Sequence, residues 1–569
     1  MSTHARPLAV WLSAADDTDL ERLFAARGVR SDAAWHDFFD AAEALLEPAS
    51  VEHALHILTR EEAQALLDAA SGHPGAVLPR PVSLALVRPD GTLPPPVADV
   101  VAGRTVPPEA LSAEVEPSAD SDAALAAEHA FTNVAALGDL LLATRDAPFA
   151  LLAGGMVNAA ERRRMTDAGL PVDRIDALLA LAADAGLTRV DGRLLRLTRT
   201  GDAWLRLSAA DRWSALATAF RAALPAGVRS GDGGWLPPES WQARHPWDPA
   251  WPVRSAELVR RAGLLGLVDE SGREPAWATP LREGRPADVE PLRRMLPAEV
   301  DRIFLQNDLS AIAPGPLAPA LDVRLRTMAE RESAAQASSY RFTADSLTRA
   351  LADGETEESI TAFLAELSLT GIPQPLRYLI SQTAARHGLV RISADAAAGR
   401  TRVSSTDAHL IDTLSVDQAL RPLGLLRDGD ALTTRVGAET TYWALTDAHY
   451  PATIVGADGA PIAVERHVLD DPEPEEAPSY APLLARLRAQ QGPDADAAWL
   501  DRELEAAVRH RAVVVVEVGM PDGSTRELTL EASGLGGGRL RGRDRAADVE
   551  RTLPVSSIRS ARVIDPSPT

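Results

Sequence analysis

Lysine is absent from the 569 residues of this chain, so all 58 positions counted as Lys+Arg are arginines. A P-loop NTPase uses the lysine of G-x-x-x-x-G-K-[ST] to contact the β- and γ-phosphates of its nucleotide. Arginine is a poor substitute, because its planar guanidinium is not the compact point charge that such a loop surrounds. The sequence therefore predicts that this chain does not hydrolyse nucleotide as a motor.

Cysteine is absent as well, which excludes disulfides, thiolate nucleophiles and cysteine-ligated zinc. Apolar runs stay far below the ~18 residues that span a bilayer. The apolar stretch from Pro7 to Ala15 is followed at once by Asp16, Asp17 and Asp19, so we interpret it as a core helix and not as a signal segment. We expect a cytoplasmic protein with no membrane partner.

Catalytic patterns are missing too, since the chain has no G-x-S-x-G elbow, no H-E-x-x-H and no calcium loop. His53 and His56 lie at helical i, i+3 spacing without a third ligand, which favours a solvated helix face over a metal site. Glu473, Glu475 and Glu476 fall in a linker that cannot hold paired acids at a fixed distance. We therefore predict no catalytic, cofactor-binding or metal-binding residue, and no enzyme.

Charge limits the partners of the chain, because 81 acidic residues give a net charge of −23 and a pI near 5.0. The average surface repels nucleic acid, so any DNA contact has to be local. Most of these carboxylates are explained by solubility alone. The length predicts roughly three to five domains.

The first segment, from Leu8 to about Ala70, has the pattern of helices with short loops. Val82–Val87 and Thr92-Leu93 predict two strands around the turn Arg88-Pro89-Asp90-Gly91. Helices that are closed by a hairpin indicate a winged helix.

A more complete pattern of this kind follows an acidic linker of small residues. Three helices and two strands are predicted, over residues 134–144, 158–168, 172–185, 187–190 and 194–197. The two strands flank Asp191-Gly192, which are residues favoured in a type I′ turn. This order of elements predicts a helix-turn-helix with a wing.

The third of these helices lacks the side chains that read base edges, because it carries Asp173, Asp176 and Asp184 against the single Arg174. Direct base recognition by this helix is therefore not expected. The wing has a basic strip, made by Arg189, Arg193, Arg196 and Arg199. Contact with phosphates and simple solvation of an exposed hairpin both remain open for these arginines.

A third helix-plus-strand unit is expected near residues 235–279, where five tryptophans gather. They are Trp235, Trp241, Trp247, Trp251 and Trp277. Tryptophans among arginines can stack on single-stranded nucleic acid. Packing under a proline-rich loop is the interpretation that we favour.

The most specific pattern begins with Leu305-Gln306-Asn307-Asp308-Leu309 and Ala313-Pro314-Gly315-Pro316-Leu317, which lead through a long amphipathic helix to Tyr340-Arg341-Phe342-Thr343. Three short helices and a strand follow, with landmarks at Gly354, Thr370-Gly371-Ile372-Pro373, His387-Gly388 and Leu389–Ile392. The run YRFTADSLTRALADGETEESITAFLAELSLTGIPQPLRYLISQTAARHGLVRI resembles the domain that precedes the motor in XPB-type DNA-repair helicases. The resemblance covers roughly residues 297–465.

The whole chain, from Leu8-Ala9-Val10-Trp11-Leu12 onward, is similar to actinobacterial proteins described as helicase-associated. In the helicases two motor lobes follow the resembling domain, whereas here an acidic, proline-rich linker begins at Asp470–Glu476. In the eukaryotic repair and transcription complex, the corresponding domain contacts a non-catalytic subunit with winged helices, which regulates the ATPase. The resemblance thus implies an accessory role toward a separate XPB-type helicase.

The last segment predicts a helix at 498–510 and then a small β-barrel, with strands at 513–518, 526–530, 552–555 and 558–560 and a turn at Pro521-Asp522-Gly523. The order of these pieces resembles a WYL domain, the Sm-like barrel of bacterial regulators that sense nucleic acid or nucleotides. Gly538-Arg539-Leu540 stands where the Trp-Tyr-Leu triplet is expected, which argues against the usual ligand sensing. We interpret the glycine run Gly534–Gly538 as a flexible hairpin and not as a phosphate loop, because a strand follows it.

Arg539, Arg541, Arg543 and Arg545 lie within seven residues, and alternate members point to one face if the segment is a strand. Two roles remain open for them. They either contact phosphates or form salt bridges with Glu527, Glu531 and Asp548.

Together these patterns predict a multidomain α+β protein, predominantly helical, that acts as a non-catalytic DNA-repair or transcription accessory protein. The alternative is a DNA-binding regulator with a ligand-sensing WYL-like domain. The expected parts are a helical, winged-helix-like domain at 1–113, a linker at 114–127, a winged helix at 128–230, a third unit at 231–296, the XPB-like domain at 297–466, an acidic linker at 467–497 and the WYL-like barrel at 498–569.

Overall fold

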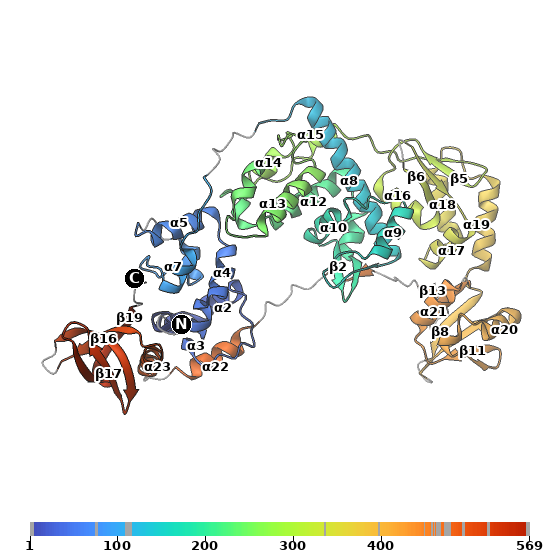
Figure 1. The fold of residues 1–569 in the computed structure, drawn as a ribbon. Coiled ribbons are helices and arrows are strands. Elements are labelled where there is room, and N and C mark those ends of the chain that lie inside the picture. Colours follow the sequence, from blue (N-terminus) through green and yellow to red (C-terminus); the bar gives the residue numbers. More distant parts are fainter. Residues whose placement is uncertain are drawn as a thin grey trace.

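The structure is a computed structural model with mixed α/β architecture, richer in helices than in strands (Figure 1). Its apolar side chains form five separate hydrophobic clusters within the residues that are described. These residues are 5–73, 78–108, 116–334, 337–395, 399–448, 450–456, 459, 461–462, 468–471, 479–491, 495–520 and 524–564. No helix among them is both long and apolar enough to cross a membrane.

The N-terminal unit is built from helices whose starts are encoded locally. Asp37 accepts hydrogen bonds from the backbone N–H groups of Phe39 and Asp40, and Thr59 forms a reciprocal capping box with Glu62. Phe24, Phe38 and Phe39 are fully buried in the core of this unit. The helices are α1 (Ala5–Ala14), α2 (Asp17–Ala26), α3 (Phe38–Leu46), α4 (Pro48–His56), α5 (Arg60–Ala70), α6 (Pro79–Ser83) and α7 (Pro95–Val101).

The predicted strand pair in this unit is wrong. Residues 79–83 form α6 instead, and residues 84–94 contain no strand. Prolines at positions 79 and 81 suit the first turn of a helix, and Leu84 and Leu86 are buried among the helices instead of alternating along a strand. The turn itself was correctly located, since the N–H of Arg88 donates to Thr92 O at 2.9 Å. The structure therefore does not show the winged-helix pattern that was expected for this unit.

The chain returns to this N-terminal unit after residue 479. Leu483, Leu484 and Leu487 of α22 (Ala481–Ala489) are buried in the same cluster as Phe24, and the Tyr480 hydroxyl donates to Val29 O at 2.7 Å. In Figure 1, α22 lies beside α3 although the two are far apart in the sequence. The expected linker at 467–497 is thus partly a helix with an apolar stripe, a periodicity that its prolines and acids obscured.

The second unit has one hydrophobic cluster whose buried members run from Ala123 to Leu292 and include Val323 of α16. All five tryptophans of this region are buried, which confirms packing as their role. Among residues 231–296 the structure has helices and no strand ladder, so the expected helix-plus-strand unit is not formed there. The elements are α8 (Asp120–Asp146), β1 (Phe149–Ala150), α9 (Ala159–Asp167), α10 (Ile175–Asp184), β2 (Thr188–Asp191), β3 (Leu194–Thr198), α11 (Arg199–Trp204), α12 (Ala209–Ala223), α13 (Trp251–Leu264), α14 (Thr279–Arg282) and α15 (Glu290–Arg293), with short 3-10 turns at Ala226–Val228 and Pro238–Ala243.

The hairpin of β2 and β3 is present as expected, but its turn is displaced by one residue. Asp191 pairs with Leu194, so the two loop residues are Gly192 and Arg193. Gly192 has φ +61° and Arg193 does not have positive φ, which fits a type II′ turn and not the expected type I′. Strand β3 also pairs with β1 on its other side, in the order β2-β3-β1. Arg193 thereby occupies the tip of the hairpin.

The third unit joins two clusters, the first of which packs helices against a small antiparallel sheet in the order β4-β5-β7-β6. Its helices α17 (Ala344–Ala352), α18 (Glu357–Leu367) and α19 (Gln374–Arg386) match the three short helices that were expected, and Gly354 and Gly388 have positive φ just after α17 and α19. The expected long amphipathic helix is shorter, because β6 and β7 follow it. The remaining elements are β4 (Phe304–Leu305), β5 (Ser310–Ala313), α16 (Pro319–Met328), β6 (Glu330–Ala334) and β7 (Ser338–Arg341).

The second cluster of this unit lies on a six-stranded sheet in the order β10-β11-β9-β8-β12-β13. Only β8 and β12 run parallel within this ladder. The elements are β8 (Val390–Asp395), β9 (Arg400–Ser405), α20 (Ala408–Val416), β10 (Leu426–Asp428), β11 (Ala431–Thr434), α21 (Ala438–Asp447), β12 (Ala452–Val455) and β13 (Pro461–Ile462), with a 3-10 turn at Arg421–Leu423.

The last unit is an open five-stranded sheet and not the closed barrel that was expected. Its strand order is β18-β17-β16-β15-β19, and in the residues described β18 and β19 do not pair with each other. Leu500, Leu504 and Ala507 of α23 pack on its apolar face, so this face is covered without closure of the sheet. The predicted turn at 521–523 lies outside the described residues. The elements are α23 (Ala495–Arg509), β15 (Val513–Gly519), β16 (Thr525–Gly536), β17 (Arg539–Asp544), β18 (Val549–Pro554) and β19 (Ile558–Ile564), with a 3-10 turn at Val555–Ser557.

Candidate nucleic-acid interface

The hairpin of β2 and β3, which we call the wing, presents arginines on its outward face. Leu195 and Leu197 point into the core, so Arg196 between them points out, directly opposite Arg189 on β2. Arg193 is exposed at the tip. The structure therefore brings three of the four predicted wing arginines to one outward surface.

Carboxylates already occupy part of this surface. Arg196 Nε lies 3.1 Å from Asp191 on the neighbouring strand, and Arg199 Nε donates to Asp470 at 2.5 Å. Asp470 directly follows β14 (Val468–Leu469), a two-residue strand of the expected linker that pairs in parallel with β3. The wing is thus less basic than its sequence indicates.

Helix α10, which occupies the place of a recognition helix, is engaged within its own unit. Asp176 accepts from Arg162 at 2.6 Å, and Asp184 accepts from Arg261 of α13 at 2.7 Å. Burial raises the pKa of Asp184, which the charge of Arg261 opposes. The acids of α10 therefore serve internal contacts, in agreement with the expectation that this helix does not read bases.

A second set of arginines lies on β17 of the C-terminal sheet. Arg539, Arg541 and Arg543 are exposed, while Leu540 and Asp544 between and after them are buried. The alternation that the sequence predicted for this strand is confirmed. Arg545 is exposed in the turn after β17, where its backbone N–H donates to Thr529 O at 2.9 Å.

The arginines of β17 differ in their neighbours. Arg543 stands between Glu531 and Glu550 on the flanking strands, and its guanidinium lies 2.7 Å from Asp548. The salt-bridge role that the sequence left open therefore holds for this arginine.

Arg541 and Arg539 have no acidic neighbour across either strand. Arg541 stands between Gly534 and Thr552, and Arg539 between Gly536 and Pro554. Among the residues that the structure describes, neither guanidinium forms an ion pair. The phosphate-binding role thus remains open for these two.

The glycine run beside them forms the expected hairpin between β16 and β17. Gly534 and Gly536 belong to β16, and Gly537 and Gly538 have φ of +60° and +69°, as both positions of a type I′ turn require. A Cβ atom added at Gly534 or Gly536 would meet nothing within 4 Å. The surface next to Arg539 and Arg541 is therefore low and open, which lets another backbone approach closely.

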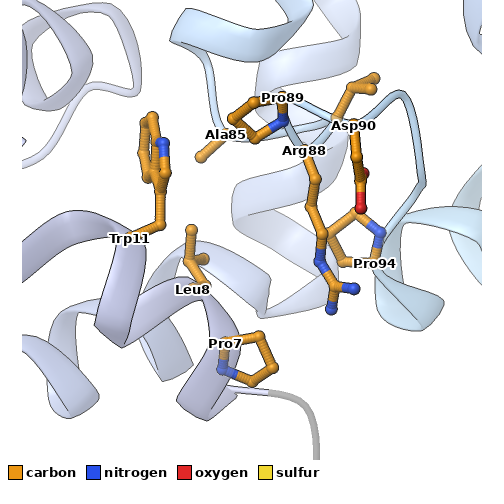
Figure 2. Close-up of a pocket in the computed structure, with 9 residues that line it drawn as sticks. Pro7, Leu8, Trp11, Ala85, Arg88, Pro89, Asp90 and Pro94 are labelled. Carbon is orange, nitrogen blue, oxygen red and sulfur yellow. The ribbon is translucent and has the colours of Figure 1, made fainter. Parts of the chain in front are cut away.

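An apolar pocket of about 290 Å³ lies in the N-terminal unit, between α1 and the turn at 85–94 (Figure 2). Leu8 and Trp11 line one side, and Pro89 and Pro94 line the other. Figure 2 shows the Arg88 side chain at the edge of this pocket. Arg88 and Asp90 are the charged residues of a lining that is otherwise apolar, so this pocket suits an apolar group.

Metal binding finds no support among the residues described, where no group of three His, Asp or Glu side chains comes together. His56 pairs with Glu52 at 3.3 Å on a helix surface. The carboxylates at 473, 475 and 476 lie outside the described residues.

Sequence reasoning missed two parts of these surfaces. Asp470 and Asp471 were assigned to a linker, because nothing local indicates that β14 pairs with a strand about 270 residues earlier. The role of Gly534 and Gly536 as neighbours of the arginines depends on the strand register, which the glycine run alone does not specify.

Comparison with known proteins places a helicase-type domain in the middle of the chain. The family described as "Helicase conserved C-terminal domain" matches residues 303–428. This match covers most of the first cluster of the third unit and ends at the last residue of β10. No curated protein matches the chain. The chain therefore contains a domain related to helicases.

Proposed function

We propose that this chain is a non-catalytic, helicase-associated protein that binds the DNA backbone and acts with a separate XPB-type helicase in DNA repair or transcription. The observation that carries the proposal is a helicase-type domain at 303–428 in a chain without a single lysine. A domain of helicase origin that lacks a phosphate-binding lysine is better suited to binding a motor protein than to hydrolysing nucleotide itself.

The topology of the second unit supports a winged helix within this proposal. Its order is α8-β1-α9-α10-β2-β3, with the sheet order β2-β3-β1. Because α10 is engaged by Arg162 and Arg261, such a unit is expected to use its wing, or to contact protein, instead of reading a major groove.

The C-terminal sheet supports the DNA contact. Arg539 and Arg541 are exposed beside open glycines, and guanidinium groups without acidic partners are available to phosphate oxygens. Nothing on this face supplies a base-reading pattern, so the expected binding is to the backbone and independent of sequence. A helix followed by five strands supports the WYL-like, Sm-like interpretation of this unit.

The proposal is tested by mixing the purified full-length chain with the XPB-type helicase of its host. We expect the two to co-elute in size-exclusion chromatography at micromolar concentration, and the DNA-stimulated ATPase rate of the helicase to change. The chain alone serves as the control and is expected to release no phosphate from ATP. Absence of both co-elution and rate change, or ATP hydrolysis by the chain alone, contradicts the proposal.

A DNA-binding regulator that needs no helicase is the second candidate, because the same exposed arginines favour it. The two candidates separate in one experiment. A chain that binds DNA with a steep dependence on salt and ignores the helicase supports the regulator.

A further inference from the structure

The wing receives a strand from the far side of the chain. Val468 and Leu469 of β14 pair in parallel with Leu197 and Thr198 of β3. Val468 also packs against the hydrophobic cluster of the second unit. In Figure 1 this short orange segment lies beside the hairpin that is labelled at β2, where it pairs with β3. Backbone pairing and apolar packing together fix the position of the two residues that follow.

Those two residues are acids, and both reach the base of the wing. Asp470 accepts from Arg199 Nε at 2.5 Å, and Asp471 accepts from the backbone N–H of Thr200 at 2.9 Å. The hydrogen bond and charge of Arg199 lower the pKa of Asp470, and the charge of Arg189 acts in the same direction. The carboxylate of Asp470 is therefore ionised at neutral pH and is paired with Arg199, the first residue of α11 directly after β3.

A carboxylate at this place uses the same donors that a phosphate would use. Guanidinium and backbone N–H groups bind carboxylate and phosphate oxygens with similar geometry. The acids thus stand in for two anionic oxygens of a nucleic-acid backbone.

The contact is also weak enough to exchange. The Arg199 and Asp470 side chains are 64% and 82% exposed, and exposed ion pairs contribute little and are screened by salt. The acids are held nearby mainly because β14 tethers them, which raises their effective concentration at the wing.

We propose that Arg199 forms a phosphate-binding site for a nucleic-acid backbone at the base of the wing, and that Asp470 and Asp471 occupy this site in the free protein and compete with the nucleic acid. The inference rests on the proposed DNA binding and adds a second DNA contact, at the wing, to the one on the C-terminal sheet. In the free protein this second contact is covered by Asp470 and Asp471. Nucleic acid has to displace the two carboxylates before it reaches the base of the wing.

The test compares two full-length double variants of equal net charge. Asp470→Asn with Asp471→Asn removes the competing carboxylates, while Asp167→Asn with Asp173→Asn removes two exposed acids of the same unit that do not contact the wing arginines. Binding to a fluorescent DNA duplex is measured by anisotropy at about 50 mM and 200 mM salt. We expect the first variant to bind roughly three- to tenfold more tightly than the control variant at low salt, with a smaller difference at high salt.

A third variant checks that the gain passes through the arginine. In an Arg199→Gln background, removal of the two acids is expected to increase DNA affinity no more than the control substitutions do. A double-mutant cycle measures this difference. A gain of equal size with and without Arg199 overturns the assignment of the site.

The outcomes separate the two proposals. If the wild-type chain binds DNA but the two double variants bind equally, the masked site is wrong and the proposed function stands. If no variant binds DNA at low salt, both the masked site and the DNA-binding part of the proposed function are wrong.

Discussion

The wing and the C-terminal sheet each carry a strip of arginines, half-buried at Arg189 and Arg196 of the wing and exposed on β17, and their surroundings differ. On the wing, Asp191 on the adjacent strand and Asp470 from the linker pair with arginines. On β17, Arg543 is the arginine that has an acidic partner within the part of the chain that the structure describes, and Arg539 and Arg541 face glycine, threonine and proline. The comparison teaches that a basic run in a sequence becomes a basic surface only where pairing across strands leaves it without acids.

The largest expected effect comes from arginines that form partly buried ion pairs within the folded protein. Asp139 of α8 binds Arg326 at 2.6 Å and also Arg331, and this ion cluster, with Asp139 and Arg326 18% and 19% exposed, joins the second unit to the third. Asp139→Ala leaves the Arg331 guanidinium without its ion pair and leaves Arg326 with only the longer contact to Asp322 at 3.7 Å, so we expect a loss of about 3 kcal/mol in the free energy of unfolding. Chemical denaturation followed by tryptophan fluorescence measures it.

Asp191→Ala is the matched control on the wing. Its carboxylate is 53% exposed, and loss of its pair with Arg196 is expected to cost less than about 1 kcal/mol. Equal losses in the two variants contradict the distinction between structural and surface pairs.

The next effect concerns the unpaired arginines. Arg539→Gln with Arg541→Gln is expected to weaken DNA binding about tenfold near 50 mM salt and to reduce the slope of log K against log salt by about 2, because two phosphate contacts are lost. Arg543→Gln, whose guanidinium is already paired with Asp548, is the control and is expected to have little effect. If Arg543→Gln weakens DNA binding equally, the ion pair with Asp548 does not determine which arginines bind DNA.

A smaller effect is expected from shape alone. Gly534→Val keeps the charge and suits a strand, but fills the open space beside Arg541, so affinity is expected to fall about two- to threefold. Thr525→Val, on the same strand and away from the arginines, is the control for anisotropy titrations. Unchanged affinity in Gly534→Val means that no backbone approaches this face.

The smallest expected effect is a dependence on pH, which we expect for folding stability through His245 and not for DNA binding through arginine. DNA binding by guanidinium groups is expected to stay constant from pH 6 to 8, because arginine does not titrate there.

His245 is different, since its Nδ1 lies 2.8 Å from Leu58 O and its burial lowers its pKa. The folded state therefore favours the neutral ring, so stability is complete above the unfolded pKa of about 6.5 and declines as pH falls below it.

Melting temperature measured against pH tests this last point. His245→Asn is expected to flatten the decline below pH 6.5, because the group that has to be protonated on unfolding is gone. The same slope in both proteins shows that other groups set the acid limit.

Sequence reasoning located the elements whose signals are local. Helices α17, α18 and α19, the β2–β3 hairpin and the exposed alternation on β17 all follow from apolar period, capping residues and glycine stops. It failed where distant segments decide the outcome. Leu84 and Leu86 were assigned to a strand because their helical neighbours are not visible in the local pattern, and Leu483 to Leu487 were hidden in a linker for the same reason.

The return of α22 to the first helices has a consequence during synthesis. Tyr480 reaches Val29 across 451 residues of chain. At about 5–20 residues per second, a ribosome needs roughly 20 to 90 s to make that interval. Throughout this time the apolar surface around Phe24 is not covered by α22, so this unit is completed only after the units that follow it in the sequence have been made.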